Sequence, residues 1–389
     1  YRGRKDLIET LMKVSCLHEN ITRGLNIVGR AVASRSTLPV LGNVLLSTDN
    51  SGIKLSATNL EMGITCWVGA KVHEPGSTTL PAKTLIDLIS TLPKEQIDFE
   101  LDEHTQTMRL ACAEFTNDIK CINSEEFPVL PSIEDNKNVD INVTNLREMI
   151  DQVVFAAASD DSRPVLTGVE VKINNNGISF AAADGFRLAV CESVLTSTDE
   201  TDEIDVIIPA RALSELGRII GDQDDPVSLS IPPGDGQIIF KINDVELVCQ
   251  LIEGKFPDYQ PLLPDGYKTR AVMTTDKILA ACRAAQIFAR EASYAVTLSI
   301  KSGDEKGQGF LEVSANAAET GSNETVVETI LEGEPIDVSF NVRYLTEVLR
   351  VIDTPNVAFE TNGDASPGVV RPVGREDFVS VIMPMHVSR

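Results

Sequence analysis

The stretch Val248–Pro264, VCQLIEGKFPDYQPLLP, decides how the rest of this sequence is interpreted, because an earlier stretch has the same order of features. Ile119–Pro131 reads IKCINSEEFPVLP. Each stretch is an apolar, strand-like run followed by an acidic turn, a Phe-Pro pair and a Leu-Pro end, and proline there stops a strand or a helix. The two Phe-Pro pairs, at Phe127 and Phe256, lie roughly 130 residues apart, and self-similarity at a fixed period indicates repeated structural units.

A second landmark repeats three times and sets the number of units. A Pro-Ala-basic opening of an amphipathic helix occurs at Pro81–Leu88 and again at Pro209–Leu216, and Asn341–Val348 has the same pattern with Asn-Val in place of Pro-Ala. Around each copy the apolar residues alternate as in strands and recur at helical spacing in two segments. We therefore expect an α+β fold of three repeated domains, each with two helices and mostly antiparallel strands. The expected boundaries are 1–11 for an N-terminal extension without assigned function, then 12–135, 136–266 and 267–389.

Composition indicates an ordinary globular chain with an unusual charge. The 389 residues are 42% hydrophobic and 24% charged, which fits two to four domains. No apolar run reaches the roughly 18 residues of a membrane span, and the N-terminus lacks the apolar core of a signal peptide. Seven scattered cysteines without a CxxC pair favour a reducing compartment over a disulfide framework or a zinc site. These features predict a cytoplasmic protein without membrane contact. A net charge of −24 on its own argues against nucleic acid as a partner.

The net charge of the chain does not show where its basic residues lie. Four of the six expected helices carry two arginines seven residues apart, and residues i and i+7 share one helix face. These pairs are Arg23/Arg30, Arg211/Arg218, Arg283/Arg290 and Arg343/Arg350, and Lys83 and Arg147 lie in the early turns of the other two helices. One such pair would be an ordinary solvated face, but corresponding pairs in a repeat favour a polyanion-binding surface. Because acids are interleaved with these cations and phosphate contacts read no bases, we expect weak binding of DNA without sequence preference.

No constellation of residues indicates a catalyst. The four histidines do not cluster with cysteines or acids at ligand spacing, and phosphate-binding and hydrolase motifs are absent. Asp184-Gly185 is typical of a hairpin turn. A metal-dependent hydrolase using Asp184 or Asp258 is the weakest of the hypotheses. We therefore expect a protein that is not an enzyme, with no catalytic residues, no metal and no cofactor.

Five motifs, in order along the chain, carry a resemblance to a known family. They are RSTLPVLGN (Arg35–Asn43), SRPVLTG (Ser162–Gly168), ADGFRLA (Ala183–Ala189), GKFPDY (Gly254–Tyr259) and MPM (Met383–Met385). Together they resemble the bacterial DNA polymerase III beta subunit, the sliding clamp, from about Met12 to about His386. The resemblance implies three domains of the DNA-clamp fold and a head-to-tail homodimer that closes into a ring with helices lining its hole.

The same resemblance implies a function and its partners. Family members encircle double-stranded DNA, slide on it without sequence specificity and act as the processivity factor of the replicative polymerase. The implied partners are duplex DNA, a second copy of the chain, the catalytic subunit of DNA polymerase III, the clamp loader and other clamp-binding replication and repair proteins. The implied location is the bacterial cytoplasm, at the nucleoid during replication.

The resemblance also assigns site residues. A hydrophobic peptide pocket between the second and third domains would be lined by Leu166, Ala183, Gly185, Phe186, Arg187, Leu188, Pro257, Pro261, Leu262, Asn341, Tyr344, Val381, Ile382, Met383, Pro384 and Met385. An apolar, Met-rich chain end is a suitable surface for a short hydrophobic peptide. Arg35 matches a basic DNA-contacting residue, and the dimer interface would use Ile119, Ile287 and Phe288.

The sequence departs from the family pattern in the expected pocket. Ala183, Phe186, Pro261 and His386 stand where several members have a Thr, a His or basic residues, which makes the expected pocket more apolar. Pro164-Val165 stands where some members have two DNA-contacting aromatic residues, so that contact is not carried over. The alternative hypothesis is a repeat scaffold that binds only proteins, with the arginines as ordinary surface charge.

Overall fold

The computed structural model describes residues 11–386, apart from 34, 50–51, 133–137, 176, 195–202, 222, 233, 235 and 306. The expectation of an extension at residues 1–11 therefore lies outside the described residues, except that Leu11 opens the first strand. The chain divides into two compact units. Unit 1 is Tyr1–Val143 with Arg218–Leu251, and unit 2 is Thr144–Gly217 with Ile252–Arg389.

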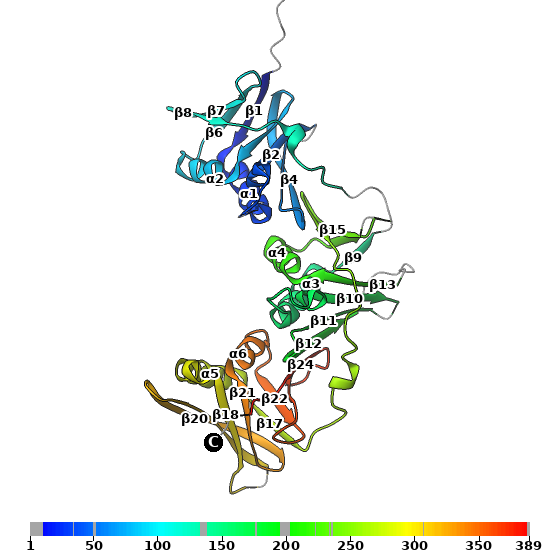
Figure 1. The fold of residues 1–389 in the computed structure, drawn as a ribbon, viewed down its shortest axis with the longest axis vertical. Helices are drawn as coiled ribbons and strands as arrows, with labels where there is room; N and C mark the ends of the chain where they lie inside the picture. The colour runs from blue at the N-terminus through cyan, green and yellow to red at the C-terminus, as the bar shows by residue number, and fades with distance from the viewer. Residues whose placement is uncertain are drawn as a thin grey trace, which may run out of the picture. The chain divides into compact units, whose positions relative to one another are not determined.

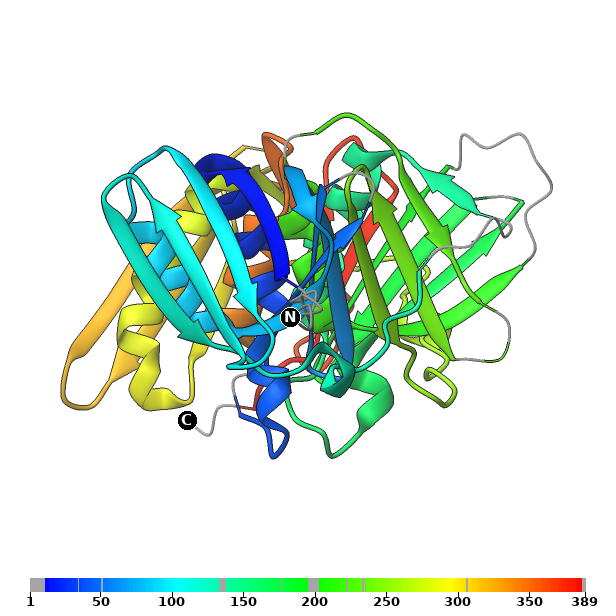
Figure 2. The same cartoon turned by 90° about the horizontal axis from the view of Figure 1, so that it is seen from above.

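Unit 1 is one twelve-stranded antiparallel sheet with helices packed on it (Figures 1 and 2). Its main path of neighbouring strands is β8-β7-β6-β1-β4-β16-β15-β14-β9, with β3, β2 and β5 branching from β4. The elements are β1 (Leu11–Leu17), α1 (His18–Val28), β2 (Asn43–Asp49), β3 (Gly52–Thr58), β4 (Met62–Glu74), β5 (Ser77–Pro81), α2 (Ala82–Thr91), β6 (Gln96–Asp102), β7 (Thr107–Cys112), β8 (Phe115–Lys120), β9 (Val139–Ile141), β14 (Val227–Ser230), β15 (Gln237–Ile242) and β16 (Val245–Gln250).

Helix α1 packs closely on the sheet of unit 1 because its inner face is apolar and includes a glycine. Ile21, Leu25 and Val28 are buried on that face. A side-chain carbon at Gly24 would come within 2.6 Å of Val68 on β4, so only glycine permits this approach. The polar face of α1, which includes Arg23, is left outward.

Unit 2 contains the second twelve-stranded antiparallel sheet, in the order β13-β10-β11-β12-β24-β23-β22-β17-β20-β19-β18-β21. Helices α5 and α6 pack against each other, and α5 also packs on β19 and β20 (Figure 1). The elements are α3 (Val143–Val153), β10 (Gly168–Asn174), β11 (Gly177–Ala183), β12 (Arg187–Ser193), β13 (Ile204–Pro209), α4 (Ala210–Ile220), β17 (Thr269–Thr274), α5 (Thr275–Ala289), β18 (Ala295–Ser302), β19 (Gln308–Ala317), β20 (Gly321–Gly333), β21 (Ile336–Asn341), α6 (Val342–Arg350), β22 (Asn356–Thr361), β23 (Gly368–Pro372) and β24 (Phe378–Ile382). Val143, which begins α3, and Arg218–Ile220, which end α4, belong to unit 1.

The expected fold class is confirmed, since helices and antiparallel sheets recur in the predicted order. One detail of the helix prediction is wrong. Arg30 and Arg290 do not lie in α1 and α5 but in the 3₁₀ turns that follow them, Gly29–Ala31 and Arg290–Ala292. Helices often tighten in this way at their C-terminal end. The division into three domains stays a prediction.

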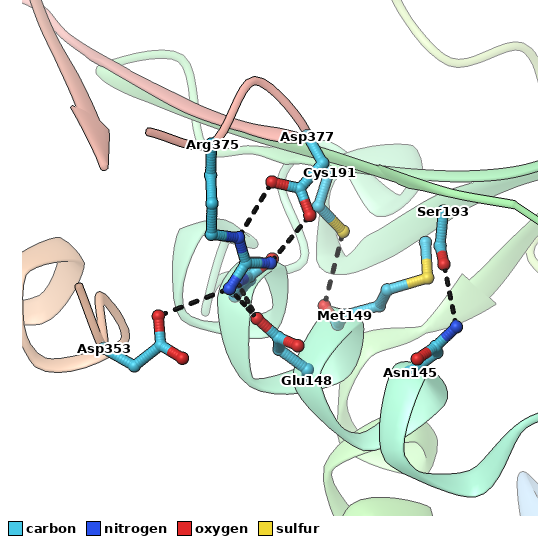
Figure 3. A network of polar contacts seen from close by, with 9 residues as sticks. Asn145, Glu148, Met149, Cys191, Ser193, Asp353, Arg375 and Asp377 are labelled. Carbon is cyan, nitrogen blue, oxygen red and sulfur yellow. Dashed lines mark hydrogen bonds and ion pairs between the residues drawn. The ribbon is translucent and has the colours of Figure 1, made fainter. Parts of the chain in front are cut away.

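A network of polar contacts around Arg375 holds α3 in unit 2 (Figure 3). The Arg375 guanidinium donates to Asp377 at 3.0 and 2.7 Å, to Asp353 at 3.3 Å, and to Glu148 on α3. Arg375 lowers the pKa of the Asp377 carboxyl chiefly by donating hydrogen bonds to its charged form. The turn between β23 and β24 is thereby joined to the helix that carries Arg147.

Candidate nucleic-acid interface and peptide groove

The cations that the sequence assigned to DNA binding all lie at the surface. Eleven side chains are exposed to solvent, on or directly beside the helices or, for Arg35, in the loop after α1: Arg23, Arg30, Arg35, Lys83, Arg147, Arg211, Arg218, Arg283, Arg290, Arg343 and Arg350. The six α-helices of the described chain carry nine Lys or Arg and seven Asp or Glu. The helices are thus slightly basic although the whole chain has a net charge of −24.

Two of the helix acids are already paired with cations outside the helices. Glu148 on α3 pairs with Arg375, and Glu347 on α6 pairs with Arg187. These pairs neutralise acids that would otherwise lie beside the exposed arginines. The helix surfaces are therefore more favourable to a polyanion than their composition alone indicates.

Four cations of unit 1 surround one hollow of about 540 Å³. They are Arg23, Arg30, Lys94 and Arg218, above apolar side chains that include Ile27 and Ile219. Arg23 is also paired with Asp244. Lys94 was not among the predicted residues. Lys94 follows Pro93, where the sequence pattern ends the helix. No helical spacing there indicated which way the Lys94 side chain points.

All sixteen residues of the predicted peptide pocket belong to unit 2, but they differ in exposure. Phe186, Leu262 and Met383 are exposed apolar side chains, with 62%, 53% and 42% of their surface accessible. Gly185, Pro257 and Pro261 are also exposed, and Ala183, Arg187, Asn341, Tyr344, Pro384 and Met385 are half-buried. Leu166, Leu188, Val381 and Ile382 are buried. Leu166, Leu188 and Val381 belong to an apolar cluster with Phe256 and Tyr259.

Strand pairing brings the two parts of this set together. On β12 and β24, Leu188 lies opposite Val381 and Arg187 opposite Ile382. The backbone N–H of Met383 donates to the carbonyl of Phe186 at 2.8 Å, so the Met-Pro-Met segment continues beside the turn before β12. Phe186 and Met383 therefore lie directly beside the buried pair of Leu188 and Val381. We call the sixteen residues of the predicted peptide pocket the unit 2 groove.

The turn between β11 and β12 directs Phe186 outward. Asp184 Oδ1 accepts hydrogen bonds from the backbone N–H groups of Phe186 and Arg187, at 2.8 and 3.1 Å. Gly185 has φ +93°, a conformation that glycine adopts without strain. The predicted hairpin turn is confirmed, and Asp184 has a structural role within it.

Arg187 is the polar centre of the unit 2 groove. Its side chain is only 10% exposed and pairs with Asp184 at 3.0 Å and with Glu347 on α6. Its guanidinium carbon also lies 4.4 Å from the centre of the Tyr344 ring and 5.4 Å from that of Phe155. Burial raises the pKa of the Tyr344 hydroxyl. Arg187 thus fixes β12 to the helix that presents Tyr344.

One residue of the groove was missed by the sequence analysis. Arg163 Nη2 donates to the carbonyl of Asp184 at 2.8 Å, and its guanidinium lies over Gly185, where a side-chain carbon would meet it at 2.8 Å. Arg163 occurs in the quoted SRPVLTG motif, and that position was its only signal. Its exposed guanidinium adds a cation to a surface predicted to be apolar.

The described residues contain no group of three or more His, Cys, Asp or Glu side chains placed to hold a metal ion. None of the helices described is long and apolar enough to cross a membrane. Asp258 Oδ1 accepts from the backbone N–H of Gln260 at 3.2 Å and so stabilises a turn, as Asp184 does.

Comparison with known proteins agrees with this architecture. Three family models match in succession: the N-terminal domain of the DNA polymerase III beta subunit over residues 12–131, its central domain over 140–258 and its C-terminal domain over 260–386. The chain belongs to the DNA polymerase III beta subunit family. The resemblance noted in the sequence is thereby confirmed over almost the whole chain.

Curated relatives and solved structures of the family span the chain from end to end. The beta sliding clamp of Synechococcus elongatus is 31% identical over 97% of this chain and 100% of its own, and that of Bacillus subtilis is 28% identical over 96% and 99%. The crystal structure of the Bacillus subtilis sliding clamp has a TM-score of 0.90 at 26% identity, covering 97% of this chain and all of its own. A Pseudomonas aeruginosa sliding clamp bound to griselimycin has a TM-score of 0.87 at 29% identity, with the same coverage. This beta-subunit chain therefore has the sliding-clamp fold.

Proposed function

We propose that this chain is a subunit of a DNA sliding clamp, the processivity factor of a replicative DNA polymerase. The observation that carries the proposal is the set of eleven exposed cations on or beside the helices of a strongly acidic chain that belongs to the beta-subunit family. Phosphate contacts of this kind hold any DNA sequence equally. A clamp needs only weak contacts, because enclosure of the duplex rather than affinity keeps the polymerase on its template.

The ring would be a head-to-tail homodimer. In the described part of unit 1, β8 ends the main strand path and pairs only with β7, so its outer edge has backbone groups without a strand partner. An unpaired edge is a template for another chain. Unit 2 offers an exposed apolar residue, Ile287, on α5, with Phe288 half-buried beside it. We propose that β8, near Ile119, meets this surface of a second copy.

The unit 2 groove would receive a short hydrophobic peptide from each partner in turn. Phe186, Leu262 and Met383 supply exposed apolar area, and methionine adapts to ligands of different shape. The partners we propose are the catalytic subunit of DNA polymerase III, the clamp loader and other clamp-binding proteins. The chain itself would catalyse no reaction, and it would act in the bacterial cytoplasm.

Reversing the charge of Arg211 and Arg218 together tests the proposal against a scaffold that binds only proteins. A clamp with Arg211→Glu and Arg218→Glu should lose most of the processivity that it confers on its polymerase on a primed circular template, and its DNA binding should have a shallower salt dependence by about two phosphate contacts. The matched control reverses Lys172 and Lys301, two cations of the sheets. Equal processivity in both variants, with partner binding retained, would favour the scaffold.

A further inference from the structure

The turn between β3 and β4 in unit 1 repeats the groove-forming turn of unit 2 in its hydrogen bonds. Asn59 Oδ1 accepts from the backbone N–H groups two and three residues later, at 3.0 and 2.8 Å. Asp184 Oδ1 does the same in unit 2, at 2.8 and 3.1 Å. The residue after each has a positive φ, 76° at Leu60 and 93° at Gly185. The two turns therefore share one backbone conformation and one pattern of hydrogen bonds.

The strand beside each turn also corresponds in register. Val248 on β16 lies opposite Gly63, just as Val381 on β24 lies opposite Leu188. Gly63 also pairs with Thr58, and Leu188 also pairs with Ala183, each across its own turn. Gly63 and Leu188 are thus the first residues after their turns that pair with the strand before the turn. The neighbouring strand, β16 in unit 1 and β24 in unit 2, therefore has the same register relative to the turn.

The same backbone hydrogen bond forms at the end of β16 in unit 1 and directly after β24 in unit 2. The N–H of Gln250 donates to the carbonyl of Glu61 at 2.9 Å, and that of Met383 donates to the carbonyl of Phe186 at 2.8 Å. Glu61 thus occupies in unit 1 the position that Phe186 occupies in unit 2, and Gln250 that of Met383. The backbone frame is shared, and the side chains on it differ.

Unit 1 has an open hollow of about 210 Å³ at this frame, which we call the unit 1 groove. Its apolar lining includes Leu60, Met62, Pro128, Val129, Leu130 and Val248. Val129 is 95% exposed and Leu60 54% exposed. Two large apolar side chains that are exposed to solvent at one hollow indicate a surface that a partner covers.

The backbone at Leu60 gives an independent reason to assign this surface a role. The left-handed conformation is strained for leucine, and glycine or asparagine would largely avoid that strain. The equivalent residue of unit 2 is a glycine, so the turn does not require leucine. Strain that persists at an exposed apolar residue is typical of functional surfaces.

The charge of the residues that line the unit 1 groove indicates which kind of peptide it would bind. Glu61 is the only charged residue among those that line the hollow in the described structure, and Gln237 and Gln250 supply side-chain amides. An exposed carboxylate beside apolar area complements a cationic side chain next to an apolar one. Phe186 stands at the same position in unit 2, so the two grooves should prefer different peptides.

We propose that the unit 1 groove binds a short linear peptide of a partner protein that carries an apolar side chain next to a lysine or arginine. The inference rests on the proposed function only in taking the equivalent unit 2 groove as a peptide site. A chain with two such grooves can hold two different peptides at once.

Methionine methyl groups report on both grooves in one spectrum. Met62 lines the unit 1 groove, and Met383 and Met385 lie at the unit 2 groove, among seven methionines in the chain. The full-length protein with ¹³C-labelled methionine methyls is titrated with acetyl-Leu-Lys-Leu-Phe-amide, and separately with its Leu-Glu-Leu-Phe counterpart. We expect saturable shifts of Met62 with the lysine peptide, and at least about tenfold weaker binding of the glutamate peptide at this site.

Two variants assign the Met62 shift to the groove. Leu60→Asn keeps a residue suited to the positive φ and should weaken binding at Met62 about tenfold, since much of a leucine contact is lost, while Met383 responds as before. Glu61→Lys should reverse the preference between the two peptides at Met62 alone.

Each outcome decides between the two proposals. Shifts of Met383 and Met385 with Met62 unmoved would overturn the unit 1 groove and leave the unit 2 groove intact. Shifts of Met62 alone would uphold the unit 1 groove and contradict the peptide site of the proposed function. A Met62 response that is unchanged in Leu60→Asn and Glu61→Lys, or absent with both peptides, would also overturn the inference.

Discussion

The guanidinium of Arg187 lies 4.4 Å from the centre of the Tyr344 ring, so a strand residue holds a helix residue in place at the rim of the unit 2 groove. Because Arg187 also pairs with Asp184 and Glu347, its planar cation joins the β11–β12 turn to α6. A buried cation with two carboxylates and two rings around it is costly to remove, since its partners would lose their counter-charge.

Replacing Arg187 with methionine should therefore weaken binding of a hydrophobic partner peptide at least about tenfold and lower the free energy of unfolding by about 2–4 kcal/mol. The matched control is Arg270→Met, because Arg270 has two carboxylate partners and a tyrosine ring, but on β17. Calorimetric titration and urea unfolding would measure both. Equal losses of peptide affinity in the two variants would show that Arg187 acts only through stability.

Removing the carboxylate that pairs with Arg23 should strengthen DNA binding. Asp244 competes with a phosphate for the Arg23 guanidinium, and exposed ion pairs of this kind contribute roughly 0.2–1 kcal/mol. Asp244→Asn should thus raise affinity for duplex DNA at low salt by up to about fivefold. Fluorescence anisotropy with Asp118→Asn as control would test this, because Asp118 pairs with Arg109 on neighbouring sheet strands. An unchanged or lower affinity in Asp244→Asn would contradict the role assigned to Arg23.

Charged residues at the proposed interface should separate the ring into single subunits. Ile287 is 64% exposed on α5, so Ile287→Lys with Phe288→Asp removes apolar contact without opening a fully buried site. Light scattering across a dilution series should give a mass near 42.2 kDa for the variant and twice that for the original chain. Leu38→Asp, at another exposed apolar residue, is the control. A full dimer in the double variant would refute this interface.

The Arg375 network should contribute to stability in a pH-dependent way. Arg375→Met is expected to lower the free energy of unfolding at pH 7 by about 1–3 kcal/mol, since three acids lose a donor. Arg375 lowers the pKa of Asp377, so the contribution of this pair is complete above the ordinary aspartate pKa of about 3.9 and is lost as pH falls through the lowered native pKa.

The difference between the original chain and Arg375→Met should therefore narrow below about pH 4 in urea unfolding. Arg371→Met, which removes one pair with Glu360, is the control for loss of a single arginine. A difference that stays constant down to pH 2 would mean that Asp377 is not the partner that matters.

Much of the surface chemistry was predictable because it depends on local pattern. The helical spacing around Arg211 and Arg343 predicted exposed cations, and both are exposed. Burial within the unit 2 groove was harder to predict. Leu188 and Val381 carry the same apolar signal as Phe186, yet the first two are buried and the third is exposed. Alternation along a strand gives two faces but does not say which residue a neighbouring strand will cover.

The repeated landmarks by themselves determined the α+β class, the order of helices and strands, and the surface placement of the cations, because each of these follows from residues close in sequence. Tertiary structure alone decided the grooves. Ser380 donates to the carbonyl of Leu188 across 192 positions of the chain, and Arg187 meets Tyr344 on a different element. Such contacts depend on the register between distant strands, which no local period encodes. The same register gives unit 1 a groove whose backbone matches that of unit 2, although Glu61 and Gln250 stand in unit 1 where unit 2 has Phe186 and Met383.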